Sequence, residues 1–426
     1  MVCLSAALPH RGGFGGGLMA TIYNNSTCST LNSRETCPSA ASESYFLNRR
    51  DETVVGPKAV AVPGFLSGLY RAYERFSSKH LTWKQLLMPT VELCVRGINV
   101  SEDLSRDLQR FHSMIANDPA MRSLFINQTT RQVLSPGDKM FCPQLAAFLS
   151  DISDTENPVD YFYRGEGSAR ILKAINEEEA FITARDLDDF ESEHQLGLQS
   201  HIGGTTLCGP QPPSLYAVVQ LAVNAMQSIN STATPDIPLL SWDQSKLIAD
   251  AIFDSDITID AAKMTTGGAV ESIFKSLKDG LHPKLKWEPS EEGSFSALII
   301  DENGQAVSIG SSLGDKFGSR QFTNLGFFLN NAMGAFTYGT RPGSVEERNA
   351  PQAAKCPRTR MTPMIASQSG VVEFVAGGTD YIRLCRVVAD TLLGRKTQNA
   401  LSSPLLFKNG DGLELKSGDQ ALLSGY

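Results

Sequence analysis

The spacing of apolar residues changes twice along this chain, from a strand pattern to a helix pattern and back. This order limits the folds that the chain can adopt. Near the N-terminus a glycine turn, GGFGGG at residues 12–17, leads into the β-rich run LMATIY. From Phe65 onward apolar residues recur at three- and four-residue spacing, which is typical of amphipathic helices. From Ser294 the pattern is again that of strands. Helices gathered between strands at both ends predict an α+β domain with αββα layering.

The clearest local signal is a β-hairpin near residue 300. Two β-rich runs flank Asn303-Gly304, and this dipeptide tolerates the positive φ of a type I′ turn. Folding the chain about the turn is expected to pair Phe295 with Ser312. Ser294 and Ser312 would then lie diagonally adjacent, within reach of one site. Two hydroxyl groups meeting at the mouth of a hairpin form a candidate functional site.

Shorter segments carry local signals of their own. Thr82 and Thr183 have the sequence context of helix N-caps. Val54–Val62 has the composition of a short strand. Residues 242–280 continue the helical pattern, whereas His282–Gly293 is charged and contains proline, so it is predicted to be an exposed loop.

Composition and charge exclude several functional classes. The 426 residues include 38 basic and 46 acidic side chains, and no stripe of Lys and Arg stands out, so no nucleic-acid partner is expected. No run reaches the roughly 18 apolar residues of a membrane span, and no signal peptide is visible. The eight cysteines contain no C-x-x-C pair, so no zinc site, and no metal or organic cofactor, is implied. Five N-x-S/T sequons are compatible with a secreted glycoprotein: Asn24, Asn25, Asn99, Asn127 and Asn230.

Motifs of other enzyme classes fail on their context. Residues 310–314 match G-x-S-x-G, but the nucleophile elbow of an α/β-hydrolase needs a helix directly afterwards and a histidine later in the chain. All six histidines precede this motif, and Asp315–Gly318 is a poor helix start. GGFGGG lacks the G-x-G-x-x-G spacing of a dinucleotide site. H-E-x-x-H and Walker motifs do not occur.

Several longer blocks occur in a fixed order between about residue 2 and residue 405, including GGFGGGLMATIYN, LNSRETCPSAA, FGSR, GFFLNNAMGAF and VAGGT. In this order they resemble the γ-glutamyltransferase family, also called glutathione hydrolases. The resemblance implies an N-terminal-nucleophile hydrolase with an αββα sandwich, whose precursor cleaves itself before a threonine. The freed threonine, with its own α-amine as base, takes the γ-glutamyl group of glutathione or a related amide. The resulting ester passes to water or to an acceptor amino acid or peptide.

The resemblance also assigns roles to individual residues. Ser294 stands at the position of the nucleophilic threonine, although serine lacks the methyl group that restrains the threonine rotamer. Gly293 would precede the cleaved bond, dividing the chain into a large-subunit-like region, 1–293, and a small-subunit-like region, 294–426. Ser312 matches a hydroxyl that supports the nucleophile. The other matches are Arg34, which would clamp the substrate α-carboxylate; Gly377-Gly378, whose amides would form the oxyanion hole; and Thr359-Arg360, at the positions of a serine pair that grips the same carboxylate.

The match is incomplete at several positions. Ala332 and Ala335 stand where the family has two carboxylates that hold the substrate α-ammonium group, and Gly314 replaces an assisting asparagine. Ser296 stands in place of a histidine. An ammonium group left without its partner typically costs about 2–5 kcal/mol of binding. Arg360 would compensate only on the carboxylate side, because a guanidinium binds carboxylate but cannot replace an anion.

Two functional interpretations therefore stand side by side. In the first, the chain cleaves itself between Gly293 and Ser294 and then transfers γ-glutamyl groups. In the second, it is a catalytically impaired relative, a pseudoenzyme with a structural or interaction role. The retained Arg34 favours the first, and the alanines at 332 and 335 favour the second. By family analogy the protein is expected outside the cell or on the outer face of the plasma membrane, while lacking the family's N-terminal anchor, its first helical layer and the strand–helix region after Pro404.

Overall fold

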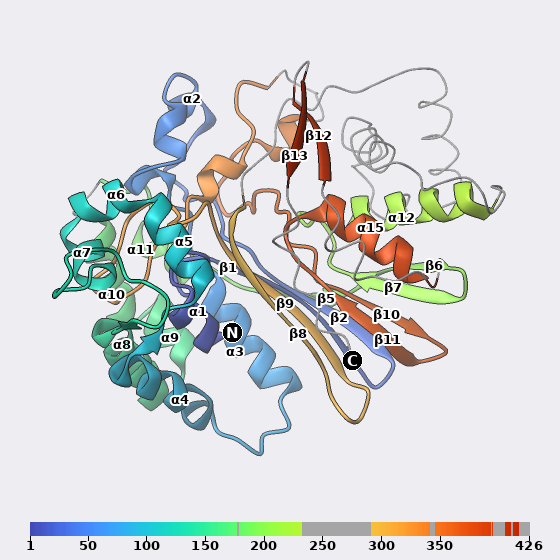
Figure 1. Cartoon of the computed structure of the whole chain (residues 1–426), viewed down its shortest axis with the longest axis horizontal. Helices are drawn as coiled ribbons and strands as arrows, with labels where there is room; N and C mark the ends of the chain where they lie inside the picture. Colours follow the sequence, from blue (N-terminus) through green and yellow to red (C-terminus); the bar gives the residue numbers. More distant parts are fainter. Residues whose placement is uncertain are drawn as a thin grey trace.

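The computed structural model describes residues 1–176, 179–231, 291–340, 346–392, 394, 405–409 and 412–416. At its centre two antiparallel sheets face each other (Figure 1). The strands of the first sheet are β1 (Gly17–Asn24), β2 (Thr27–Ser33), β5 (Glu193–Leu196), β8 (Gly293–Ile300) and β9 (Ala306–Gly314), in the order β5-β2-β1-β9-β8. Those of the second are β6 (Leu198–Ile202), β7 (Thr205–Gly209), β10 (Met364–Gln368) and β11 (Val371–Ala376), in the order β11-β10-β7-β6. Two short pairs lie apart: β3 (Ile98–Asn99) with β4 (Lys139–Met140), and β12 (Leu405–Asn409) with β13 (Gly412–Lys416).

Helices cover the outer faces of both sheets, so the predicted αββα layering is confirmed (Figure 1). Against the first sheet α3 (Phe65–Phe76) contacts both β1 and β2. The second sheet is covered by α12 (Tyr216–Ser231), which contacts β6 and β7, and by α15 (Tyr381–Leu392), which packs on α12. The other helices that the structure describes are α1 (Val2–Ala7), α2 (Glu43–Phe46), α4 (Trp83–Arg96), α5 (Glu102–Arg110), α6 (His112–Asn117), α7 (Pro119–Phe125), α8 (Pro143–Asp154), α9 (Pro158–Tyr163), α10 (Glu166–Asn176) and α11 (Ala184–Asp188).

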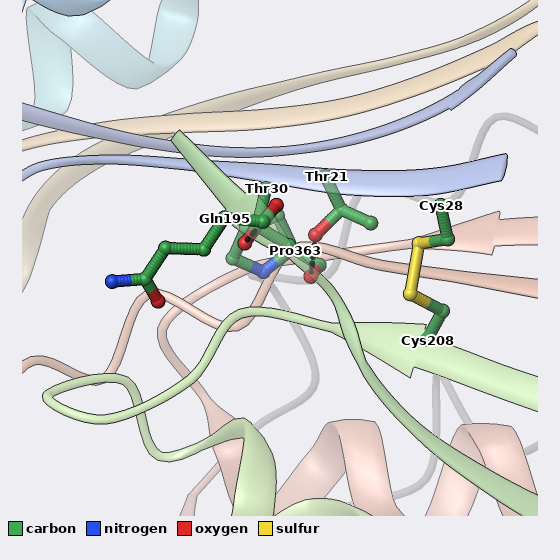
Figure 2. Close-up of a disulfide and its surroundings, with 6 residues drawn as sticks. All are labelled: Thr21, Cys28, Thr30, Gln195, Cys208 and Pro363. Atoms are coloured by element: carbon green, nitrogen blue, oxygen red, sulfur yellow. Dashed lines mark hydrogen bonds between the residues drawn. A yellow bond between two sulfur atoms is a disulfide. The ribbon is translucent and has the colours of Figure 1, made fainter. Parts of the chain in front are cut away.

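Side chains bridge the two sheets in the interior. A disulfide joins Cys28 on β2 to Cys208 on β7, as Figure 2 shows. Nearby, the Thr21 hydroxyl of β1 donates a hydrogen bond of 2.7 Å to the carbonyl oxygen of Pro363, just before β10. Within the first sheet, the Thr30 hydroxyl donates to the Gln195 carbonyl at 3.4 Å. The disulfide and the Thr21 hydrogen bond hold the two sheets face to face. The candidate site is built on these sheets.

The predicted helix caps are confirmed. Thr82 begins α4 and Thr183 begins α11, and at each the side chain accepts from the backbone N–H three residues on. In both cases the third residue, Gln85 or Asp186, bonds back to the cap, which forms a capping box.

Other local predictions are wrong or lie outside the described residues. Val54–Val62 is not a strand, because Pro57 offers no backbone N–H and begins a short 3-10 turn at Pro57–Ala59. The strands β5, β6 and β7 were not predicted. Residues 242–280, and residues 282–290 of the predicted loop, lie outside the described residues.

Candidate active site

The hairpin β8–β9 brings Ser294 and Ser312 together, as predicted, but in a different register. Ser294 lies directly opposite Ser312, and Phe295 lies opposite Ser311. The cause is the turn, in which Gly304 has a φ of 76° and its N–H donates to the carbonyl of Asp301 at 3.1 Å. The Asp301 N–H donates to Gln305, so the loop has three residues rather than the two of a type I′ turn. The register therefore moves by one residue.

The Ser294 hydroxyl lies in a short chain of hydrogen bonds. Its Oγ is 2.9 Å from Oγ1 of Thr379, which in turn donates to the carbonyl oxygen of Glu291 at 3.2 Å. A hydroxyl has one proton to donate. Because Thr379 gives its proton to Glu291, Ser294 is the donor to Thr379, and the Ser294 lone pairs stay available.

The Ser312 hydroxyl is buried beside the bond that precedes Ser294. Its Oγ donates to the carbonyl oxygen of Gly293 at 3.0 Å and accepts from the Gly314 N–H at 2.9 Å. Gly293 itself approaches the backbone so closely that an added Cβ would lie 2.1 Å from the carbonyl oxygen of Asp315. Only glycine fits at this position.

The Gly377-Gly378 pair follows β11 and leads directly to Thr379. A Cβ at Gly377 would lie 2.7 Å from the Ser308 hydroxyl, so this glycine allows the turn to pack against β9. The carbonyl of Gly378 accepts from the backbone N–H and the hydroxyl of Thr362, at 3.0 and 3.1 Å. The pair is thus fixed next to the hairpin, and its oxyanion role remains a prediction.

The residues predicted to bind a substrate carboxylate contact a carboxylate of the protein itself, that of Glu291. Arg34, which directly follows β2, places Nη2 2.9 Å from Oε1 of Glu291. The Thr359 hydroxyl lies 2.9 and 3.0 Å from the two carboxylate oxygens, and the Arg360 N–H donates to Oε2. Thr359 is fixed by backbone bonds of 3.0 Å to Pro213 and Leu215, just before α12.

Arg360 contacts Glu291 through its main chain, and the predicted contact of its side chain with a substrate stays a prediction. Its backbone N–H, not its guanidinium, donates to Glu291. The guanidinium carbon lies 5.6 Å from the ring centroid of Tyr381, a cation–π distance.

The charges around Arg34 are fully buried. Burial would lower the pKa of Arg34, but the carboxylates of Glu35 and Glu291 outweigh it and raise that pKa. Glu35, whose Oε2 is 2.8 Å from Nη1 of Arg34, has a raised pKa, because burial outweighs the attraction of the guanidinium. Burial also raises the pKa of the neighbouring Cys356 thiol, to about 12.

The region where the family has ammonium-binding carboxylates is apolar here. Ala332 begins the 3-10 turn η5 (Ala332–Ala335) and is 1% exposed in a cluster with Phe46, Phe336 and Tyr338. Gly314 has a φ of 89°, and an added Cβ would lie 2.1 Å from Oδ1 of Asn331. The Asn331 amide thus fills the space that a side chain at position 314 would take.

Two site residues were missed from the sequence. Glu291 belongs to the segment predicted to be exposed, yet it is 2% exposed, and the prediction is wrong at this residue. Thr379 directly follows the glycine pair in the block VAGGT, and that adjacency was the available signal. For Glu291 the signal was weaker, an acidic side chain three residues before the predicted nucleophile.

The described residues contain neither a cluster of metal ligands nor a helix that could span a membrane. In that part of the chain no group of three His, Cys, Asp or Glu side chains is arranged to hold a metal ion. Among the described helices none has both the length and the apolar character needed to cross a bilayer.

The family model for gamma-glutamyltranspeptidase matches residues 1–409. The chain belongs to this family. It is 27% identical over 418 residues to glutathione hydrolase 3 of Arabidopsis thaliana, covering 92% of this chain and 64% of that protein. It is also 24% identical over 444 residues to scoloptoxin SSD14 of Scolopendra dehaani, covering 95% of this chain and 75% of that protein. The family includes enzymes named glutathione hydrolases, and the chain spans about two thirds to three quarters of the length of these two relatives.

Solved structures of the gamma-glutamyltranspeptidase family and of an acylase share the fold. A cephalosporin acylase from Bacillus halodurans aligns with a TM-score of 0.79 at 17% identity, over 97% of this chain and 79% of the other. A gamma-glutamyltranspeptidase from Helicobacter pylori aligns with a TM-score of 0.57 at 19% identity, over 65% of this chain and 82% of the other. These likenesses show the fold, a sandwich of two sheets between layers of helices.

Proposed function

We propose that this protein cleaves its own Gly293–Ser294 bond and then uses Ser294 to transfer γ-glutamyl groups from glutathione or related amides. One observation carries the proposal. The bond between Gly293 and Ser294 has a hydroxyl donor, Ser312, on its carbonyl oxygen, and a hydroxyl partner, Thr379, on the serine that follows. This is the arrangement that an intramolecular acyl shift requires.

In the self-cleavage step, Ser294 Oγ attacks the carbonyl carbon of Gly293. The hydroxyl proton leaves through Thr379, and negative charge develops on the Gly293 carbonyl oxygen, where the Ser312 hydroxyl stabilises it. The C–N bond then breaks, the nitrogen of Ser294 takes up the proton that passed through Thr379, and Gly293 is left as an ester on Ser294 Oγ. Water hydrolyses the ester, which yields a Gly293 carboxylate and a Ser294 with a free α-amine and hydroxyl.

In the transfer step, the free α-amine of Ser294 accepts the proton of its own hydroxyl. Ser294 Oγ attacks the γ-carbonyl of the substrate, the amide bond breaks, and the leaving amine takes the proton. Gly377-Gly378, adjacent to Thr379, supplies the amides for the developing oxyanion, and Arg34 with Thr359 binds the substrate carboxylate. Water or an acceptor amine then releases the γ-glutamyl group. We place this reaction outside the cell, as the analogy implies.

A second candidate is favoured by a specific observation. Ala332 lies in an apolar cluster, so no carboxylate from η5 is available for a substrate ammonium group. On this view the protein is a catalytically impaired relative with a structural or interaction role.

Self-processing distinguishes the two candidates. The full-length wild-type protein should run as two pieces on a denaturing gel, with masses matching residues 1–293 and 294–426, and should release amine from a γ-glutamyl anilide. Ser294→Ala should stay intact and inactive. Ser296→Ala, a serine two positions along the same strand, is the matched control and should process normally. An intact wild-type chain without hydrolysis would contradict the proposal and support the second candidate.

A further inference from the structure

The buried carboxylate of Glu291 already has every partner that an incoming carboxylate would use. Arg34, the Thr359 hydroxyl and the Arg360 N–H all contact it, and Glu291 is 2% exposed. A bound ligand would need the same donors in the same positions. The two occupants are therefore mutually exclusive.

Glu291 lies close to Ser294 along the chain, just before the bond that is proposed to be cleaved. Two residues separate it from Ser294, so their Cα atoms lie within about 11 Å even in a fully extended chain. Its backbone carbonyl also accepts from Thr379, the partner of Ser294. Both ends of the residue are thus tied to the site, one through the side chain and one through the main chain.

The neighbouring acidic residue, Glu292, does not share the contacts of Glu291. Glu292 directs its carboxylate elsewhere, with Oε2 3.8 Å from Arg110 and 3.9 Å from Lys316. Its side chain is 45% exposed, whereas that of Glu291 has no exposure. Of these two glutamates, only Glu291 contacts Arg34, Thr359 and Arg360.

We infer that Glu291 is an internal ligand of the carboxylate site, and that the uncleaved chain excludes outside carboxylates until residues 291–293 withdraw. The inference rests on the proposed function for the identity of the site. While Gly293 is bonded to Ser294, Glu291 is held close to the site through residues 292 and 293, and its effective concentration at Arg34 is high. Cleavage releases one flank and places a new carboxylate on Gly293, so the segment becomes a free tail that a ligand can displace.

The inference can be tested without catalysis, in a protein that cannot cleave itself. The probe is glutarate, because the Glu291 side chain shows that the site accepts a carboxylate at the end of a short methylene chain. Binding is measured by calorimetry on full-length Ser294→Ala, alone and combined with Glu291→Gln or with the control Glu292→Gln. We expect glutarate to bind the Glu291→Gln combination at least ten-fold more tightly than Ser294→Ala, and the Glu292→Gln combination no more tightly.

Equal glutarate affinity with and without Glu291→Gln, including no binding to either, would overturn the inference. A second measurement needs no change at Glu291. A glutamyl endopeptidase should cleave slowly after Glu291 in Ser294→Ala, and saturating glutarate should accelerate that cleavage by displacing the side chain. A rate unaffected by glutarate would contradict the inference. Neither result depends on whether the wild-type protein processes itself or hydrolyses glutathione, so the two proposals fail separately.

Discussion

Ser312 donates a hydrogen bond of 3.0 Å from its hydroxyl to the carbonyl oxygen of Gly293, across the hairpin. The same hydroxyl accepts from Gly314, so its proton is directed at Gly293. A donor fixed in this way before any reaction stabilises charge on the oxygen without reorganisation.

Ser312→Ala should therefore slow self-cleavage by about 100-fold, the effect typical of losing one oxyanion donor. The measurement is the rate of appearance of the piece 294–426 on denaturing gels after synthesis. Ser311→Ala is the matched control, since this adjacent buried serine bonds to Gly13 and Gly17 instead. Equal rates for Ser312→Ala and wild type would exclude the role of Ser312.

Thr379→Val should slow the same step by about 10- to 100-fold, because the Ser294 proton loses its acceptor. The conservative variant Thr379→Ser keeps the hydroxyl and should restore most of the rate. Rates are compared by the same gel assay. Equal impairment of both variants would contradict the role of the hydroxyl, because Thr379→Ser retains it.

Ala332→Glu should destabilise the protein rather than create an ammonium site. The new carboxylate would enter the cluster of Phe46, Phe336 and Tyr338, and an unpartnered buried charge typically costs several kcal/mol. The free energy of unfolding in urea is the measurement, with Ala332→Val as a control of similar burial. Undiminished stability together with tighter γ-glutamyl binding would mean that the side chain points into the substrate site.

Asp107 should make stability depend on pH. Burial would raise the pKa of Asp107, but hydrogen bonds from His10, Lys316 and Arg11 outweigh it and lower that pKa. A lowered carboxyl pKa stabilises the fold above the unfolded value of about 3.9, and this stabilisation is lost as pH falls below it. Asp107→Asn should cost about 3–5 kcal/mol at pH 7, since it removes the carboxylate that lies 2.6 Å from the buried ammonium group of Lys316.

The check on Asp107 is a series of urea titrations between pH 7 and pH 3. The stability difference between wild type and Asp107→Asn should be constant near neutrality and shrink below about pH 4. A difference that stays constant to pH 3 would show that Asp107 has an ordinary pKa.

Cys28→Ser should lower the free energy of unfolding by about 2–5 kcal/mol, because the disulfide to Cys208 closes a long loop across both sheets. Thermal unfolding of the variant and of the reduced wild type should give similar Tm values. Cys37→Ser is the control, since Cys37 is a buried free thiol. An unchanged Tm in Cys28→Ser would indicate that the bond is not formed in the protein.

The parts of the fold that could be predicted are those with strong local signals. The caps at Thr82 and Thr183 and the hairpin at Gly304 depend on residues close together in sequence. The strands β5, β6 and β7 are short, and much of β5 is exposed, so their sequence carries no clear alternation. Their pairing depends on the sheets they join rather than on their own residues.

Some residues of the candidate site could likewise be predicted from the sequence, and others could not. Family blocks located Ser294, Ser312, Arg34 and Thr359, and the structure brings all four to one place. Glu291 could not be found by local pattern, because its burial depends on donors from two distant segments, at Arg34 and at Thr359-Arg360. A charged residue in a loop is ordinarily exposed, and only the assembled sheets provide the cation that holds it.

The strand orders determine what a break at Gly293 would leave behind. Each sheet takes strands from both sides of that bond, with β1 paired to β9 in one sheet and β7 paired to β10 in the other. The disulfide between Cys28 and Cys208 lies wholly on one side. The products would be two chains without a covalent link, and what was the interior of one domain would become a subunit interface. Separating these two subunits would then be the same event as unfolding them.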